Sequence, residues 1–127
     1  MKMHYTAALS LLAGVALGAA AIQSLHAQAK PPIYYVAEID VTNADAYAKE
    51  YVPKAQALIK ASGGRIVAAS SKVSAMEGAA PKRVAVITWE SMEKLQAWRN
   101  SAEFKDNRKT GDKYAKFRSY ALEGMPQ

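Results

Sequence analysis

The sequence predicts an α+β domain in which two β-α-β units form a four-stranded antiparallel sheet with both helices on one face. Segments rich in β-branched and aromatic residues alternate with amphipathic segments in the order β-α-β-β-α-β, all within residues 33–123. The 127-residue chain has room for one core. Half of its residues are hydrophobic and 22% are charged, which is typical of a globular protein.

The first strand and helix are the best-marked elements of the first unit. Residues 33–41 (IYYVAEIDV) predict a strand because β-branched and aromatic residues dominate them. Thr42 or Asn43 caps the helix that follows. Pro53 lies inside this helix and cannot donate a backbone hydrogen bond, so we expect a kink near Tyr51.

The first helix ends at Gly63-Gly64, a pair that predicts a left-handed C-cap. Residues 65–70 predict the second strand, with an extension over 73–76 after a bulge as an open alternative. A turn marked by Gly and Pro at 77–81 then leads to residues 83–89 (RVAVITW), the clearest strand in the chain.

The second helical region divides into two parts. Ser91 caps the first part, and Asn100 or Ser101 begins the second. Gly111 is expected to interrupt that second part, because glycine is a poor helix former. Residues 117–123 predict the last strand.

Right-handed crossovers in both units imply a ferredoxin-like strand order, 4-1-3-2, with the helices on one side of the sheet. The first strand nevertheless carries apolar side chains on both faces, with Tyr34 and Val36 opposite Ile33, Tyr35 and Ile39. A small domain without disulfides is stabilised when such a surface is covered. We therefore expect a homodimer that packs sheet against sheet.

Residues 1–29 have the three parts of a secretory signal peptide. Lys2 precedes the uncharged run 7–22, and small residues ending in Ala27-Gln28-Ala29 follow it. The apolar run is shorter than the roughly 20 residues that a spanning helix needs. We expect cleavage after Ala29 or Ala27, a periplasmic or secreted domain over residues 30–127, and no stable membrane anchor.

The expected mature chain contains neither Cys nor His, because His4 and His26 lie in the signal segment. The commonest general base, the commonest metal ligand and thiolate chemistry are therefore missing. Removing Lys2 leaves 16 basic and 11 acidic residues, a net charge of +5. We expect no metal and no cofactor, and no nucleic-acid partner, because the sequence has no nucleic-acid-binding motif.

Several segments resemble one known family: YYVAEIDV, YAKEYVPKAQALIKASGGR, RVAVITWESMEKLQAWRNSAEFKDNRKTG and YALEG. Over residues 32–124 the chain is similar to the bacterial domain-of-unknown-function family thirteen-thirty, in the dimeric α/β-barrel superfamily. The resemblance implies a ferredoxin-like subunit in a barrel-like dimer, and it brings no established reaction. Superfamily relatives include quinone-forming monooxygenases, haem-degrading enzymes and small-ligand binders. The expected mature chain has no His to ligate haem.

Glu38 is the candidate general base, because it shares a face of the central first strand with apolar residues, and a carboxylate held there can accept a proton. The fourth strand neighbours the first, so Arg118 or Tyr120 is expected beside Glu38. The alternative is a structural Glu–Arg pair at a sheet edge or a dimer seam.

Aromatic residues predict a flat pocket for an aromatic or quinone-like ligand, with core packing as the alternative. Arg108 belongs to a locally basic stretch, residues 104–118, which would attract an anion unless it is simply a solvated helix face. The candidate ligand-binding residues are Tyr34, Tyr47, Trp89, Trp98, Phe104, Arg108 and Tyr120, with Tyr114 as a further aromatic.

Three functions remain open. The first is an exported, dimeric binder of a small aromatic or anionic molecule. The second is a cofactor-free monooxygenase- or isomerase-like enzyme that uses Glu38 with Arg118. The third is a structural or stress-associated dimer without a ligand. A pocket of about 300 Å³ or more, lined by aromatic residues and one buried carboxylate, would favour the first two.

Overall fold

Residues 30–126 are described by a computed structural model, in which residues 31–125 form one unit. The predicted signal segment, residues 1–29, lies outside the described residues. The elements in chain order are β1 (Ile33–Val41), α2 (Ala44–Ala46), the π-helical turn η1 (Tyr47–Tyr51), α3 (Val52–Ala61), β2 (Arg65–Ser70), β3 (Arg83–Trp89), α4 (Met92–Arg99), α5 (Ala102–Asp112) and β4 (Ala115–Glu123). Within residues 30–126, no helix is both long and apolar enough to cross a membrane.

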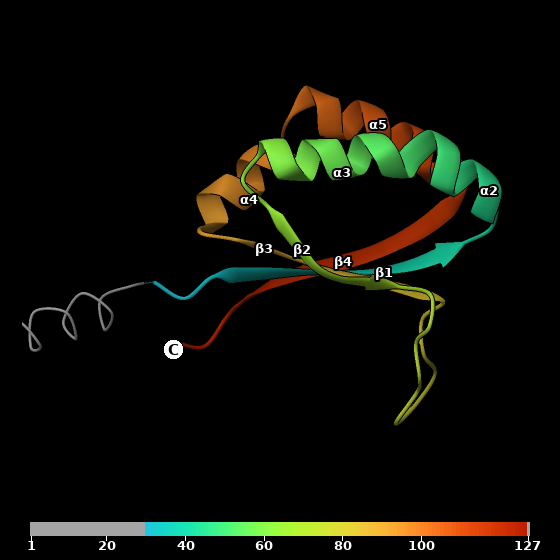
Figure 1. The fold of residues 1–127 in the computed structure, drawn as a ribbon, viewed down its shortest axis with the longest axis horizontal. Helices are drawn as coiled ribbons and strands as arrows, with labels where there is room; N and C mark the ends of the chain where they lie inside the picture. The colour runs from blue at the N-terminus through green and yellow to red at the C-terminus, as the bar shows by residue number, and fades with distance from the viewer. Residues whose placement is uncertain (1–29, 127) are drawn as a thin grey trace, which may run out of the picture. The chain divides into compact units, whose positions relative to one another are not determined.

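The four strands form one antiparallel sheet in the order β2-β3-β1-β4, so β1 and β3 are central as predicted. Figure 1 shows the helices on a single face of this sheet. This arrangement confirms the predicted ferredoxin-like α+β fold. In the observed register, Glu38 of β1 lies between Val84 of β3 and Arg118 of β4.

The first helical connection begins at Asn43, whose side-chain oxygen accepts a hydrogen bond from the Ala46 N–H. The irregularity predicted near Tyr51 takes the form of the π turn η1. Here the Val52 N–H bonds to the Tyr47 carbonyl, five residues earlier. Pro53 follows directly in the first turn of α3, where its missing N–H is least costly.

The end of α3 is the predicted left-handed cap. Gly63 has a φ of +86°, and its N–H bonds to the Lys60 carbonyl at 3.1 Å. The Gly64 N–H reaches back to the Ile59 carbonyl at 2.9 Å, which completes a Schellman motif. β2 ends at Ser70, so the alternative of a bulge followed by an extension over residues 73–76 was wrong; the register shift that β2 does contain lies within the strand, between Ile66 and Ala68.

Serine caps begin both helices of the second unit: Ser91 accepts from the Lys94 N–H and Ser101 from the Phe104 N–H. The prediction that Gly111 interrupts the second helix was wrong, because α5 continues through Asp112. Gly111 is buried, and a Cβ there would lie 2.7 Å from the ring of Tyr51. Its missing side chain permits close packing of α5 rather than ending the helix.

The core lies between the helices and the inner face of the sheet. On β1 the side chains alternate strictly: the inner residues Ile33, Tyr35, Ala37 and Ile39 are buried, whereas the residues between them are partly exposed. The outer face continues onto β4 with exposed apolar side chains, of which Leu122 is 50% exposed.

Candidate functional site

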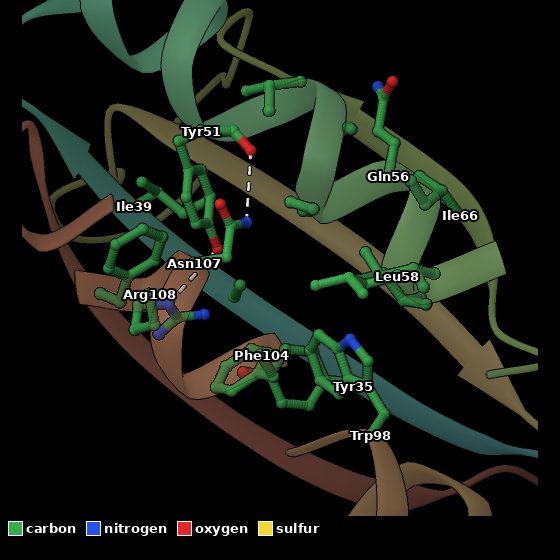
Figure 2. Close-up of a pocket in the computed structure, with 18 of the residues that line it drawn as sticks. Tyr35, Ile39, Tyr51, Gln56, Leu58, Ile66, Trp98, Phe104, Asn107 and Arg108 are labelled. Atoms are coloured by element: carbon green, nitrogen blue, oxygen red, sulfur yellow. Dashed lines mark hydrogen bonds between the residues drawn. The ribbon is translucent and has the colours of Figure 1, made fainter. Parts of the chain in front are cut away.

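A cavity of about 80 Å³ lies between the inner face of the sheet and the helices (Figure 2). Its lining is mostly aromatic and aliphatic, with a few polar side chains. The lining residues are Tyr35, Ala37, Ile39, Tyr47, Tyr51, Val52, Ala55, Gln56, Leu58, Ile59, Ile66, Ala69, Arg83, Ala85, Ile87, Trp98, Phe104, Asn107, Arg108 and Phe117. Residues from both the sheet and the helices therefore line the cavity.

An aromatic wall closes one end of the cavity. The Tyr35 and Trp98 rings meet edge to face at 5.2 Å between centroids, and Trp98 meets Phe104 in the same way at 4.6 Å. Strand alternation turns Tyr35 inward, while Trp98 and Phe104 occupy the buried faces of α4 and α5. Edge-to-face pairs of this kind fix ring orientation, so this wall is a preformed surface.

A polar group made of Tyr51, Asn107 and Arg108 lies at another side of the cavity (Figure 2). Arg108 Nε donates to the Tyr51 hydroxyl at 3.3 Å, and Asn107 Nδ2 donates to the Tyr51 carbonyl at 3.4 Å. The Arg108 guanidinium also lies 3.8 Å from the centroid of the Phe117 ring. These contacts hold a cation against aromatic faces, where the ring quadrupole stabilises it.

The two tyrosines of η1 both line the cavity and are both buried. Burial raises the pKa of the Tyr51 hydroxyl, and the nearby Arg108 opposes this effect. Burial also raises the pKa of Tyr47, with an added contribution from Tyr51 and opposition from Arg83. Both hydroxyls are therefore protonated near neutral pH and can donate hydrogen bonds.

Three buried polar atoms of the cavity lining have no hydrogen-bond partner within residues 30–126: Tyr35 Oη, Arg83 Nε and Trp98 Nε1. Arg83 does use another nitrogen, Nη1, to donate to Ser71 Oγ at 3.3 Å. An unsatisfied buried polar group costs roughly 1–3 kcal/mol, so a guest that accepts hydrogen bonds would be stabilised here. The lining contains two arginines and no carboxylate.

The sheet separates the predicted site residues into different regions. Tyr47, Trp98, Phe104 and Arg108 line the cavity. Trp89 packs in the core beside the cavity, with Nε1 donating to Ser62 Oγ at 3.0 Å. The remaining predicted residues lie on the outer face of the sheet: Tyr34, Glu38, Arg118 and Tyr120. Glu38 therefore does not reach the cavity.

On that outer face, Tyr120 donates its hydroxyl hydrogen to Glu38 Oε2 at 3.0 Å, and this hydrogen bond raises the Tyr120 pKa. Arg118 Nη1 lies 4.0 Å from Glu38 Oε1, and the Arg118 side chain is 80% exposed. This geometry is that of the structural Glu–Arg pair. An exposed pair of this kind contributes little to stability.

The sequence reasoning missed Arg83 and Asn107 as cavity residues. For Arg83 a signal was available, because strand alternation places it on the same face as Ala85 and Ile87. Asn107 likewise follows Phe104 by three positions on the buried face of α5. The cavity also departs from the expected size and charge: it is smaller than about 300 Å³, and it lacks a carboxylate.

The described part of the chain contains no candidate metal site made of clustered side chains. No three His, Cys, Asp or Glu residues among residues 30–126 lie close enough together to hold an ion.

Comparison with solved structures supports the fold. RPA0582, a protein of unknown function from Rhodopseudomonas palustris, aligns with a TM-score of 0.63 at 15% identity, covering 76% of this chain and 84% of that one. SnoaB, a cofactor-independent oxygenase from Streptomyces nogalater, aligns with a TM-score of 0.57 at 9% identity, covering 76% and 96%. HapK from Hahella chejuensis aligns with a TM-score of 0.57 at 16% identity, covering 75% and 94%.

At these identities the likeness establishes the fold alone. No curated protein matches the chain. The model of one family, described as Domain of unknown function (DUF1330), matches residues 32–125. Because this match spans nearly all of the described residues, the chain belongs to the DUF1330 family, as its sequence segments predicted.

Proposed function

We propose that this protein binds a small aromatic acid in the cavity between its sheet and its helices. The observation that carries the proposal is the set of unpartnered buried atoms, Tyr35 Oη, Arg83 Nε and Trp98 Nε1, in an otherwise aromatic and apolar lining. These atoms can donate hydrogen bonds to an anionic oxygen, while the surrounding rings accept a planar apolar body.

Charge favours an anion over a neutral or cationic guest. Arg83 and Arg108 both line the cavity, and the lining has no Asp or Glu to neutralise them. A carboxylate or phenolate would meet two guanidinium groups in a partly buried setting, where charge-assisted hydrogen bonds are stronger than neutral ones. The protonated hydroxyls of Tyr47 and Tyr51 add further donors.

The volume restricts the ligand to one ring. A cavity of about 150 Å³ holds benzene, so a cavity of about 80 Å³ must at least roughly double in volume to admit an aromatic acid. The lining residues Gln56, Ile66 and Ala69 are exposed, which places a mouth between α3 and the edge strand β2. Opening at this edge would admit a single ring without breaking the central strands.

The proposal includes export and a homodimer. The signal-like residues 1–29 support export. The outer face supports self-association, because Val36 and its pairing partner Val86 lie partly exposed there, and Leu122 is exposed on the neighbouring strand β4. The N-terminal sequence of the secreted protein tests export, and a monomer by light scattering at micromolar concentration would exclude the dimer.

A second candidate is cofactor-free oxygenation of a phenol in the same cavity. The paired donors Tyr51 and Arg108 favour it, because they would stabilise a phenolate. The fold neighbour SnoaB carries the description of a cofactor-independent oxygenase. Glu38 and Arg118, the residues first expected to serve such an enzyme, lie on the other face of the sheet. If the protein consumes oxygen in the presence of a phenol and Glu38→Gln abolishes this activity, the reaction takes place on the outer face of the sheet rather than in the cavity.

Binding of benzoate tests the main proposal. We expect benzoate to quench or shift the tryptophan emission, since Trp98 lines the cavity, and titration calorimetry to give a 1:1 complex per protomer. The neutral isostere benzamide is expected to bind roughly tenfold more weakly, because a hydrogen bond to a charged group contributes about 1.5–3 kcal/mol.

Arg83→Gln removes one cavity charge and is expected to reduce the preference for benzoate over benzamide. Arg65→Gln is the matched control, because Arg65 is exposed on β2 and does not line the cavity. Equal binding of benzoate and benzamide by the unaltered protein would refute the proposal. So would an equal loss of benzoate binding in the two variants.

A further inference from the structure

A groove of about 440 Å³ lies where α4, α5 and β4 meet. Its lining residues are Arg99, Asn100, Phe104, Lys105, Arg108, Lys109, Asp112 and Phe117. Phe104, Arg108 and Phe117 also line the cavity, so a layer of three side chains divides the two spaces. The groove is therefore a separate candidate site, on the other side of this layer from the proposed aromatic-acid site.

The groove carries an excess of positive charge. Four of its lining residues are cationic, and only Asp112 is acidic. Within residues 30–126, none of the four cations forms a salt bridge with Asp112 or with any other carboxylate. Solvent ions or a ligand must therefore balance this charge.

The helix α5 directs its basic side chains toward the groove. Lys105, Arg108 and Lys109 are spaced three and four residues apart, which places them on one face of the helix. Glu103 and Asp106 of the same helix do not line the groove. The acidic residues of α5 thus leave most of the positive charge in the groove uncompensated.

Two arginines, one from each helix, stack on the same buried ring. The guanidinium groups of Arg99 and Arg108 lie 4.6 and 4.8 Å from the centroid of the Phe104 ring. The two cations are therefore within roughly 10 Å of each other, about one Debye length at 0.1 M salt. Cations held this close repel each other, and a bound anion would relieve the repulsion. The stacking keeps both guanidinium groups in position for such an anion.

Most hydrogen-bond donors of these two arginines are free. Arg108 Nε donates to the Tyr51 hydroxyl, but the other guanidinium N–H groups of Arg108 and Arg99 make no hydrogen bond within residues 30–126. Figure 2 shows Arg108 beside Phe104. A guanidinium offers its N–H groups as a rigid fork that matches the oxygens of a phosphate. The exposed side chains of Lys105 and Lys109 add mobile donors.

We propose that the groove binds the phosphate group of a phosphate monoester. Such a group has three acceptor oxygens and is mostly dianionic near neutral pH, because its second pKa is about 6. Its charge and its oxygens match two guanidinium forks and two ammonium groups better than a monoanion would. The monoester is either a free compound or the headgroup of phosphatidic acid. This inference does not rest on the proposed binding of aromatic acids, because the groove is separate from the cavity.

Titration calorimetry of the purified protein with methyl phosphate tests the inference. Dimethyl phosphate is the matched control ligand, because it keeps the phosphate but carries a single negative charge. At about 10 mM salt, where screening is weak, we expect one methyl phosphate per protomer and roughly tenfold weaker binding of dimethyl phosphate. Equal affinities for the two compounds would overturn the proposed preference for a monoester.

The double variant Lys105→Gln with Lys109→Gln is expected to weaken methyl phosphate binding about fivefold, the combined effect of two exposed charge pairs. The matched control is Lys54→Gln with Lys60→Gln, which removes the same charge from exposed positions of α3. Arg99→Gln is expected to weaken binding as well, whereas the control keeps the affinity of the unaltered protein. Equal losses in the two double variants would reveal a nonspecific charge effect and refute the groove site.

Phosphatidylcholine vesicles with and without phosphatidic acid separate the two sources of the monoester. Binding of methyl phosphate assigns the site to free monoesters. Cosedimentation only with vesicles that contain phosphatidic acid, lost in the Lys105 and Lys109 double variant, assigns it to the lipid headgroup. If neither probe binds, the inference is wrong.

Competition with benzoate keeps this inference distinct from the cavity proposal. We expect benzoate to leave methyl phosphate binding unchanged, because the layer of Phe104, Arg108 and Phe117 separates the two sites. If benzoate displaces methyl phosphate, the phosphate binds in the cavity and the groove site is refuted. If benzoate does not bind at all, the cavity proposal fails while the groove site stands on its own measurements.

Discussion

Replacing Gly111 by alanine tests whether close packing, rather than helix termination, explains this glycine. In an exposed helix interior, Gly→Ala stabilises a protein by about 1 kcal/mol, because alanine restricts the unfolded chain and favours the helix. At Gly111 the added Cβ would lie 2.7 Å from two carbons of the Tyr51 ring and 3.2 Å from Phe117 Cζ. Ordinary contacts of this kind are 3.4–4 Å.

The Tyr51 ring must therefore move by roughly 0.7 Å or more, and its neighbours restrict that movement. Tyr47 and Phe117 lie at centroid distances of 5.3 and 5.5 Å, and Arg108 holds the hydroxyl. Overpacking of this kind typically costs about 1–3 kcal/mol. Subtracting the helix gain of about 1 kcal/mol leaves an expected net destabilisation of about 1 kcal/mol.

Urea unfolding followed by tryptophan fluorescence measures this difference, because both tryptophans are buried in the core. The matched control is Gly111→Ala in a Tyr51→Leu background, where the smaller side chain leaves room for the Cβ. We expect Gly111→Ala to be at least 1 kcal/mol less harmful there, a coupling typical of residues in contact. A stabilising effect of Gly111→Ala in the unaltered background would refute the packing explanation.

Three further changes test other parts of the structure. Gly64→Ala is expected to destabilise the protein more than Gly63→Ala. A Cβ at residue 64 would lie 2.6 Å from the ring of Trp89, which is 1% exposed, whereas a Cβ at residue 63 meets free space and only the φ of +86° is strained. Equal losses of urea midpoint in the two variants would contradict this. Leu58→Ala is expected to lower the free energy of unfolding by about 2 kcal/mol, the lower end of the range for Leu→Ala, because the side chain is half-buried. The enlarged cavity is expected to bind benzoate more tightly. An unchanged Kd would show that cavity volume does not limit the ligand. The raised pKa of Tyr51 adds stability that is fully present below pH 10 and is lost as the pH rises through the folded-state pKa. The urea midpoint should therefore fall above pH 10, and it should fall less steeply in Tyr51→Phe. Parallel curves for the two proteins would refute this.

Local features of the fold were predictable from the residues themselves. Asn43, Ser91 and Ser101 cap helices, and Gly63 ends one, because these roles depend on hydrogen bonds and dihedral angles within a few residues. The strand order followed as well, since right-handed crossovers leave few alternatives for this sequence of elements.

The candidate site was only partly predictable. Their aromatic side chains indicated Tyr47, Trp98 and Phe104, which do line the cavity. Glu38 was chosen because it is a carboxylate, although strand alternation places it on the opposite face of β1 from Tyr35. Alternation separates the two faces of a strand, but it does not say which of them meets a cavity.

The sequence by itself determined the order of the elements, their caps and the family, because each depends on residue types at short spacing. Only the tertiary structure decided that Arg83, Asn107 and Arg108 meet at one cavity, and that Gly111 makes room for Tyr51. These contacts join side chains from β3, α5 and η1 that are far apart in the chain. Whether their polar atoms find partners depends on packing in three dimensions, which no local pattern encodes.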